Sequence, residues 1–453
     1  MSGLLAARVL ADFYQTVTVV ERDMLPDTPT NRQGVPQGRH GHVLLRRGSQ
    51  ILSDLFPGLL EDLLADGVPV WNDGDLSKLD LSFRGHQLVR CGRFADLSST
   101  TLYSPSRPLL EFHVRQRILA LANVTLLQRR DVLELTSTEA KDRITGVRTA
   151  DRQTGAQELL EADLVVDAMG RGSRMPVFLD HLGYERPVED ELVIRLTYSS
   201  EPFRVPPGTL KEKSYVYNFI PGRPKAVSLF GYENDTWLLT IQGIMGQETP
   251  FNHAEMLQFA AGIAPDHIVA ALHSGEPTGD VARHRIHSNR WRRYDKMRRR
   301  PSGLLAVGDA ICSFNPIYGQ GMTVAAMDAL ALRGCLRDGG PDLSRRFFDT
   351  AAKGIGVAWQ MAVGSDLALP EVKAPRPISV RLPNAYNDWV LSAAESDLQV
   401  AEQFMKVLNL VELPRRLLRP SVMSRVAIAN LRRLAAKVLN PLGSTAIRRQ
   451  ERA

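Results

Sequence analysis

The sequence predicts an α/β protein with a Rossmann-like domain, an inserted antiparallel β-sheet domain and a helical C-terminal region. Four observations support this fold class. A β-branched strand at residues 16–20 ends in acidic residues, and an apolar strand at 303–307 runs through a Pro/Gly loop into a helix. Residues 191–278 alternate between apolar and polar side chains, which predicts antiparallel strands, and the chain after residue 346 has helical periodicity.

These changes of pattern also predict the domain boundaries. The Rossmann-like domain comprises residues 1–60, 100–190 and 295–345, the inserted domain comprises 61–99 and 191–294, and the helical region comprises 346–453. With 453 residues, of which 44% are apolar and 23% charged, the chain can bury one large or two medium cores.

The composition excludes several classes of protein. No apolar run approaches the roughly 20 residues of a membrane span, and no signal peptide is recognisable. Cys91, Cys312 and Cys335 are scattered without a Cys-x-x-Cys pair, which argues against a zinc site or a disulfide framework and fits a reducing cytosol. No metal-ligand cluster, nucleophile elbow, P-loop or nucleic-acid-binding motif is present. We therefore expect a cytoplasmic protein that binds neither a metal nor nucleic acid.

The strand–loop–helix unit that starts at residue 303 is the strongest functional signal. Its strand runs into Gly308-Asp309, and its helix begins near Gly321. This arrangement places a carboxylate where it can accept hydrogen bonds from sugar hydroxyls and directs helix N–H groups at an electron-rich ring. The segment resembles the second flavin-binding motif of FAD-dependent monooxygenases of the p-hydroxybenzoate hydroxylase type. The resemblance implies that the ribitol of FAD binds Asp309, and that the pyrimidine edge of the flavin meets Pro316, Gly319, Gly321 and Met322.

The N-terminal segment carries part of a dinucleotide-binding motif. In such folds a strand and a Gly-x-Gly-x-x-Gly turn come first, and an acidic residue roughly 20 positions later binds the ribose. Here Gly3 is at the position of the last glycine, and Glu21, followed by Arg22, is at the ribose position. The preceding strand and the first two glycines are absent. Either the start is set at an internal Met, which we favour because the downstream motifs are intact, or the chain lacks a central strand and binds FAD weakly.

The loop at residues 31–45 narrows the resemblance to one subfamily. Its sequence Gly-Val-Pro-Gln-Gly-Arg-His-Gly-His, at residues 34–42, is similar to that of a bacterial subfamily of FAD-dependent monooxygenases related to squalene epoxidase. The resemblance implies that an arginine of this loop, Arg39 before Arg32, contacts the pyrophosphate or the flavin. His40 and His42 are candidate catalytic residues, since imidazole titrates near neutral pH. Structural histidines that bond loop carbonyls explain them equally well.

Two further motifs carry cofactor-binding candidates. The helix expected over residues 106–119 resembles the family helix whose arginines contact the FAD phosphates, which implies this role for Arg107 and Arg115; surface ion pairs would explain either one alone. The strand at 162–167 ends in Asp167-Ala168-Met169-Gly170-Arg171, the third motif of the family, so Asp167 and Gly170 are expected beneath the FAD. Met169 occupies a position where a small hydroxyl residue is usual.

The inserted domain is expected to cover the flavin. A hairpin pairs residues 226–232 with 236–242 across the turn at Glu233-Asn234-Asp235. The aromatic residues of this domain could line a substrate pocket or form a packed core, and the sequence leaves both alternatives open. These residues are Tyr215, Tyr217, Phe219, Phe230 and Trp237.

Two segments are strongly basic. Residues 401–453 contain 11 Lys and Arg against three acids, in an amphipathic pattern that suits either an anionic membrane surface or a helix packed on the body of the protein. We favour the packed helix. If this segment does contact a membrane, we expect it to bind the inner face of the cell membrane. Residues 283–300 suit either a pyridine-nucleotide phosphate or, more simply, a solvated linker.

Together, the motifs imply an enzyme that uses FAD and NAD(P)H to insert one oxygen atom of dioxygen into a small apolar alkene or aromatic substrate, by epoxidation or hydroxylation. The Trp-x-Trp-x-Ile-Pro motif of the family's halogenases is missing. Two alternatives remain open. One is a flavin-dependent reductase or dehydrogenase that acts on an isoprenoid-like substrate, and the other is a non-catalytic remnant that no longer holds FAD.

Overall fold

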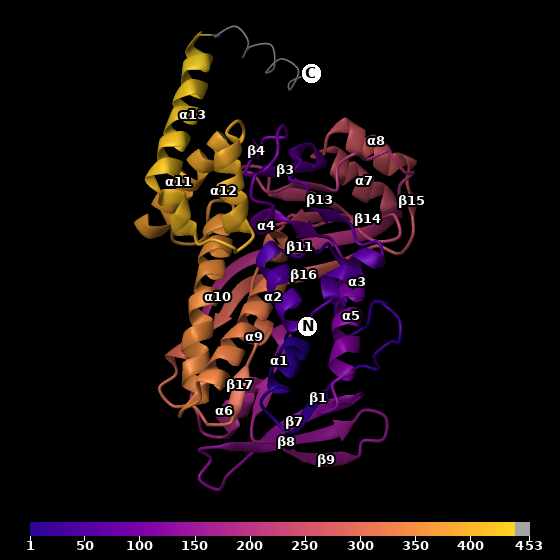
Figure 1. Ribbon diagram of the computed structural model, residues 1–453, viewed down its shortest axis with the longest axis vertical. Coiled ribbons are helices and arrows are strands. Elements are labelled where there is room, and N and C mark those ends of the chain that lie inside the picture. Colours follow the sequence, from indigo (N-terminus) through magenta and orange to yellow (C-terminus); the bar gives the residue numbers. More distant parts are fainter. Residues whose placement is uncertain (440–453) are drawn as a thin grey trace.

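A computed structural model describes residues 1–439, and its largest element is a nine-stranded sheet (Figure 1). The strands follow the order β18-β16-β11-β14-β13-β12-β3-β4, and β15 pairs with β11. All pairs are antiparallel except β12–β3. The strands are β3 (Leu79–Phe83), β4 (His86–Gln87), β11 (Glu189–Arg204), β12 (Ser214–Tyr217), β13 (Lys225–Gly231), β14 (Thr236–Gly243), β15 (Glu276–Pro277), β16 (Ala282–Arg292) and β18 (Cys312–Ser313).

Helices α7 (His253–Ala261) and α8 (Asp266–Ser274) cover one face of this sheet. Their buried residues pack with apolar side chains of β11 to β14 into one hydrophobic cluster, which includes Leu239 and Ile241. The opposite face is directed at the Rossmann-like part of the molecule and is available for a site.

The Rossmann-like part contains four parallel strands in two separate pairs. β1 (Val17–Val20) pairs with β6 (Val124–Leu127), and β10 (Val165–Asp167) pairs with β17 (Leu304–Ala306). The two pairs form separate sheets and are not hydrogen-bonded to each other.

Helices pack around these pairs to form the largest core. Leu5 and Val9 of the first helix are fully buried, and this helix packs against α9. The helices are α1 (Ser2–Leu10), α2 (Arg46–Leu55), α3 (Leu59–Ala65), α5 (Arg107–Leu119), α6 (Met175–His181), α9 (Gly321–Asp338) and α10 (Leu343–Leu367). A three-stranded meander of β7 (Arg130–Ser137), β8 (Ile144–Asp151) and β9 (Gln157–Glu161) closes the lower end in Figure 1. Two small elements, β2 (Val70–Trp71) and β5 (Leu102–Tyr103), pair beside α4 (Leu97–Thr100).

The C-terminal helices form a further unit at the upper end of the molecule (Figure 1). α11 (Ile378–Ala394), α12 (Leu398–Leu408) and α13 (Pro420–Leu439) pack on one another and on β3 through a separate hydrophobic cluster. The helical region expected after residue 346 is therefore present, and the α/β fold class is confirmed. Residues 440–453, which hold the last part of the expected basic stretch, lie outside the described residues.

The prediction of a solvated linker at residues 283–300 was wrong. Most of this segment is β16, which pairs with β11 along almost its whole length. The charges are accommodated because the strand is flanked by acids: Arg292 forms an ion pair with Glu189 at 3.0 Å, and Arg293 pairs with Asp190 at 2.7 Å. A run of arginines can thus occupy a strand near the edge of the sheet when neighbouring strands and loops supply carboxylates.

Candidate active site

A single large cavity of about 1660 Å³ lies between the Rossmann-like part and the free face of the nine-stranded sheet. It also extends between the two parallel strand pairs, since residues of β1, β10 and β17 line it. The cavity brings together residues that are more than 300 positions apart in the sequence. The predicted site residues that line it are Gly3, Glu21, Arg22, His40, His42, Arg107, Arg115, Asp167, Gly170, Asp309, Pro316, Gly319, Gly321 and Met322.

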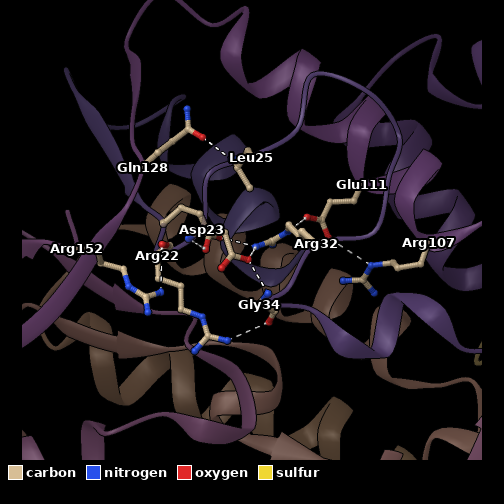
Figure 2. Close-up of polar contacts among 10 residues, drawn as sticks. Arg22, Asp23, Leu25, Arg32, Gly34, Arg107, Glu111, Gln128 and Arg152 are labelled. Carbon is tan, nitrogen blue, oxygen red and sulfur yellow. Dashed lines mark hydrogen bonds and ion pairs between the residues drawn. The ribbon is translucent and has the colours of Figure 1, made fainter. Parts of the chain in front are cut away.

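Arg39 is the predicted residue that does not line this cavity. Its side chain is exposed, on the 3-10 helix at Pro36–Arg39. The second candidate, Arg32, does line the cavity. Figure 2 shows Arg32 between the carboxylates of Asp23 and Glu111, and it bonds them at 3.1 and 2.8 Å. Of the two candidate arginines, Arg32 is therefore the one that lies in the cavity wall.

The end of β1 is organised by this arginine and by a close backbone approach. Glu21 forms an ion pair with Arg32 at 3.0 Å, so part of its carboxylate is already engaged. Asp23 accepts a hydrogen bond from the backbone N–H of Gly34 at 2.7 Å (Figure 2). A Cβ at Gly34 would lie 2.2 Å from the Asp23 carboxylate, so only glycine permits this contact. Arg22 donates to the carbonyl of Gly34 at 3.3 Å and holds the same loop.

The two candidate arginines of α5 differ in their hydrogen bonds to the rest of the protein. Arg115 is buried and donates to the carbonyl of Pro26, which fixes the loop before Arg32. The side chain of Arg107 is 9% exposed, and its Nε forms an ion pair with Glu111 at 3.5 Å but has no hydrogen-bond partner among the described residues. Because a buried guanidinium N–H without a hydrogen bond is costly, this group favours an anionic ligand.

The first turn of α1 points into the cavity beside Arg107. Met1, Ser2, Gly3 and Leu4 line the cavity, and α1 has no side-chain cap. The free N–H groups of a helix start and the positive end of its dipole bind phosphate. The close approach of Gly3 to Ala168, where a Cβ would lie 3.1 Å from the alanine Cβ, brings this helix start against the turn after β10.

The loop between β17 and α9 forms the opposite part of the cavity wall. Asp309 faces the cavity and is accessible from it, although protein surrounds it; this burial raises the pKa of its carboxyl, while Arg107 and Arg171 oppose the rise. Asn315 caps the following turn by accepting from the N–H of Ile317 at 3.2 Å, and Gly319 adopts a positive φ of 66°. The start of α9 then directs its first N–H groups, at Gly321 and Met322, toward the cavity.

The third motif, at residues 167–171, mainly stabilises the turn after β10. Buried Asp167 accepts hydrogen bonds from the hydroxyl of Ser173 and from the N–H of Met169, which shape the turn around Gly170 at φ 69°. Burial raises the pKa of Asp167, and these hydrogen bonds oppose the rise. The turn also presents Arg171, which lines the cavity.

His40 and His42 both line the cavity and are both bonded within the protein. His40 Nδ1 lies 2.9 Å from the hydroxyl of Ser200, and His42 Nδ1 lies 2.8 Å from the carbonyl of His40. Burial, with smaller contributions from nearby positive groups, lowers the pKa of His40 to about 3 and that of His42 to about 4. Both imidazoles are therefore neutral at pH 7. Each has one ring nitrogen left for a ligand, and their catalytic role stays a prediction.

The aromatic residues that the sequence offered for a pocket do not line the cavity. Tyr215, Tyr217 and Phe219 are buried in the cores on either side of the sheet, and Trp237 packs against the cluster below α7 and α8. The pocket face instead carries residues that the sequence analysis did not single out: Leu196, Tyr198, Thr240, Gln242, His284 and Ile286. The strand alternation could have found them, because they occupy every second position of β11, β14 and β16.

One group outside the cavity resembles a metal site. The ligand atoms of Asp80, Glu212 and His267 lie within 4.8 Å of one another. However, Arg90 forms ion pairs with both carboxylates, at 2.9 Å to Asp80. This guanidinium already neutralises the acids, so the cluster is explained as a structural ion-pair network.

The site can be compared with those of known proteins. Protein Rv3254 of Mycobacterium tuberculosis is 39% identical over 442 residues, which cover 95% of this chain and 92% of the relative. The chain belongs to the family of Protein Rv3254. No family model matches the sequence. A kynurenine 3-monooxygenase of Salinispora tropica is 25% identical over 361 residues, which cover 74% of this chain and 70% of that protein.

The fold is similar to that of solved flavin-dependent enzymes. The structure of the flavin-dependent brominase Bmp2 superposes with a TM-score of 0.65 and 14% identity, over 95% of this chain and 96% of that one. Together with the more distant sequence relative, this places the chain among the FAD-dependent monooxygenases, a superfamily of oxidoreductases. The general resemblance found in the sequence is thereby confirmed.

Proposed function

We propose that this protein is a FAD-dependent monooxygenase that uses NAD(P)H as reductant and inserts one oxygen atom into an apolar alkene or aromatic substrate. The observation that supports this most strongly is the single cavity in which the separate flavin-binding motifs meet. As in other flavoenzymes, FAD would supply the oxygen chemistry, and the protein would supply binding, orientation and exclusion of water.

The residues present fit FAD along the length of the cavity. Glu21 and Arg22 would bind the adenosine end, and the start of α1 with the guanidinium of Arg107 would bind the pyrophosphate. Asp309 would accept hydrogen bonds from the ribitol. The N–H groups of Gly321 and Met322 would face the flavin, where the positive helix end favours negative charge on the ring.

The free face of the nine-stranded sheet would hold the substrate. Leu196 and Ile286 of the sheet, with Phe314 and Ile317 of the loop before α9, give this part of the cavity apolar walls. Such walls favour an apolar substrate and would exclude water from the reaction. This composition supports a place in the epoxidase-like subfamily related to squalene epoxidase, in which the loop at residues 31–45 lies beside the flavin.

The experiment is an oxygen-incorporation assay with the purified full chain. The protein is loaded with FAD, supplied with NADPH and isotopically labelled dioxygen, and incubated with candidate alkenes and aromatics. We expect a flavin absorbance band, NADPH consumption stimulated by substrate, and one labelled oxygen atom in the product. Reduction of the substrate without labelled oxygen would instead indicate a reductase, and a colourless protein that never takes up FAD would indicate a non-catalytic remnant.

We also propose that the C-terminal helices contact an anionic membrane surface. α11 exposes an apolar stripe at helical spacing, Ile378, Leu382 and Trp389, with exposed fractions of 58 to 69%. α13 exposes a second stripe at Ile428, Leu431 and Leu434, and Asn430 on α13 donates to the carbonyl of Trp389 at 3.0 Å, so the two stripes adjoin. No helix among the described residues is long and apolar enough to cross a membrane. Contact would therefore be peripheral.

Basic side chains flank these stripes. Arg419 and Arg432 are exposed near the α13 stripe, and Arg381 is exposed on α11. An apolar helix face bordered by arginines is suited to the headgroup region of a membrane that contains acidic lipids. The inner face of the cell membrane has this composition, which supports the predicted cytoplasmic location with peripheral membrane contact.

A further inference from the structure

A row of polar side chains crosses the sheet face that lines the cavity. Tyr198 on β11 is the direct partner of His284 on β16 and of Gln242 on β14. Directly opposed residues in a sheet point to the same side, so the three side chains stand next to one another above the cavity. The rings of Tyr198 and His284 are 5.6 Å apart between centroids.

The neighbouring rows differ from this one. On one side, Leu196 and Ile286 are register partners and present an apolar surface to the cavity. On the other side, Ser200 and Thr240 are register partners whose hydroxyls bond each other at 2.7 Å. His40 bonds Ser200, so the polar capacity of this outer row is used within the protein.

The central row, in contrast, has an unused polar atom. Gln242 Oε1 is buried without a hydrogen-bond partner among the described residues. Tyr198 and His284 line the cavity beside this atom, and Tyr198 is only 4% exposed. Buried polar groups are normally satisfied, so a buried acceptor without a partner, next to a tyrosine and a histidine that face the cavity, points to a ligand that bonds it.

The row is also uncharged at neutral pH. Burial lowers the pKa of His284, with a smaller contribution from Arg171, and burial raises the pKa of Tyr198. Arg171 also lines the cavity, and it donates to the hydroxyl of Ser313 at 2.8 Å and to the carbonyl of Ser288 at 2.6 Å. A carboxylate at this row would lose its hydration, and it has no proton to donate to the free acceptor Gln242 Oε1.

We propose that the row His284–Tyr198–Gln242 binds the head of an uncharged, hydroxyl-bearing substrate whose apolar body lies against Leu196 and Ile286. A neutral hydroxyl both donates and accepts, and it can use the acceptor of Gln242 together with the hydroxyl of Tyr198 or the imidazole of His284. This inference rests on the proposed function for the identity of the site, and it adds the substrate class: neutral phenols and alcohols with an apolar body, rather than carboxylates.

Direct binding measurements test this class. The full chain, with and without FAD, is titrated in a calorimeter at pH 7 with three probes of one shape: 2-naphthol, 2-naphthoate and naphthalene. We expect 2-naphthol to bind about tenfold or more tightly than 2-naphthoate, since one lost hydrogen bond or one unpaired charge costs 1.4 kcal/mol or more. Equal or tighter binding of 2-naphthoate, or no binding of 2-naphthol, would overturn the proposal.

Variants locate the binding to the row. Tyr198→Phe and Gln242→Leu should each weaken 2-naphthol about tenfold and leave naphthalene unchanged, because naphthalene makes no hydrogen bond. Tyr184→Phe is the matched control: its hydroxyl donates to the carbonyl of Lys141 at 2.7 Å, outside the cavity, so its 2-naphthol affinity should equal that of the wild type. Unchanged 2-naphthol affinity in both row variants, with thermal unfolding confirming that they fold, would contradict the proposal.

The outcome is separable from that of the proposed function. If 2-naphthol binds as expected but the protein never transfers oxygen, the substrate class stands and the oxygenase function fails. If labelled oxygen is incorporated into products but the row variants bind 2-naphthol like the wild type, the function stands and the substrate class fails.

Discussion

At the scale of single residues, the structure shows which of two candidate arginines lines the cavity, a choice that the sequence could not decide. Arg39 and Arg32 lie in one loop, and the motif favoured Arg39, yet only Arg32 lines the cavity. The choice depends on Asp23 and Glu111, whose carboxylates come from a distant strand and helix and draw Arg32 inward. The sequence contains these partners but not their distances, so it could narrow the choice without deciding it.

Arg107 gives the sharpest test at this scale. Arg107→Ala should weaken FAD binding by roughly ten- to hundredfold, because a charge-assisted bond to phosphate is worth roughly 1.5–3 kcal/mol. Quenching of FAD fluorescence on binding measures the affinity. Arg39→Ala removes the same charge outside the cavity and serves as the control, with an affinity close to that of the wild type. Equal losses in both variants would indicate a general charge effect instead.

A substitution at Gly34 tests the close contact between this glycine and Asp23, the carboxylate that also binds Arg32. Gly34→Ala would place a Cβ 2.2 Å from the Asp23 carboxylate, so Asp23 must move and its bonds to Gly34 N–H and Arg32 must weaken. We expect a loss of roughly 1–3 kcal/mol in unfolding free energy, measured by urea denaturation. Gly334→Ala is the control, since nothing lies near a Cβ at that position of α9, and alanine there should be neutral or slightly stabilising. A Gly34→Ala protein as stable as the wild type would show that the contact is dispensable.

At the scale of elements, local patterns predicted most helices and strands. α5 begins directly after its Ser106 cap, and β13 and β14 agree with the predicted hairpin of residues 226–232 and 236–242 to within one residue at each end. β16 was missed because its arginines obscure the alternation, and only the acids on neighbouring elements explain its place in the sheet. The pocket-facing residues were missed for a related reason: alternation identifies two faces of a strand, but the packing of α7 and α8 decides which face is core.

One element supports the flavin-facing loop from behind. Asp366 of α10 is fully buried and accepts hydrogen bonds from Asn289 at 2.6 Å, Asn315 at 2.9 Å and Tyr318 at 2.7 Å. It thereby fixes the turn that precedes α9. Burial raises the pKa of Asp366 to about 6, although these three hydrogen bonds oppose the rise.

This raised pKa predicts a pH-dependent stability. The folded state favours the protonated carboxyl, so the contribution of Asp366 to stability is complete below about pH 4 and is lost as the pH rises through about 6. Asp366→Asn removes the titration. Relative to the wild type, the variant should therefore gain on the order of 2 kcal/mol of unfolding free energy between pH 4.5 and 7, measured by urea unfolding without FAD. A constant difference across this range would contradict the assignment.

At the scale of the whole molecule, one cavity joins the Rossmann-like part to the sheet, and the C-terminal helices form an exposed surface away from it. The sequence predicted the α/β fold class. It could not predict that the apolar residues of α11 and α13 stay exposed, because an amphipathic pattern is the same whether its apolar face meets protein or lipid. Only the packing of α11 against α13 shows which apolar positions remain at the surface.

This surface should bind vesicles that contain phosphatidylglycerol. In co-sedimentation, we expect the full chain to pellet with these vesicles at low salt, to pellet less as salt rises, and to remain in solution with phosphatidylcholine alone. The double variant Leu431→Gln/Leu434→Gln should lose most of the binding. Leu159→Gln changes an equally apolar exposed residue on the distant strand β9 and should not. Retained binding in the double variant would exclude α13 as the membrane contact.

The central claim is that the cavity holds one FAD, with Asp309 at its ribitol. Calorimetric titration of the purified full chain with FAD, with the flavin absorbance followed in parallel, tests this most directly. We predict saturation at one FAD per chain with a shifted flavin band, and a clear loss of affinity in Asp309→Ala. No heat, no spectral change and a colourless protein after dialysis would contradict it.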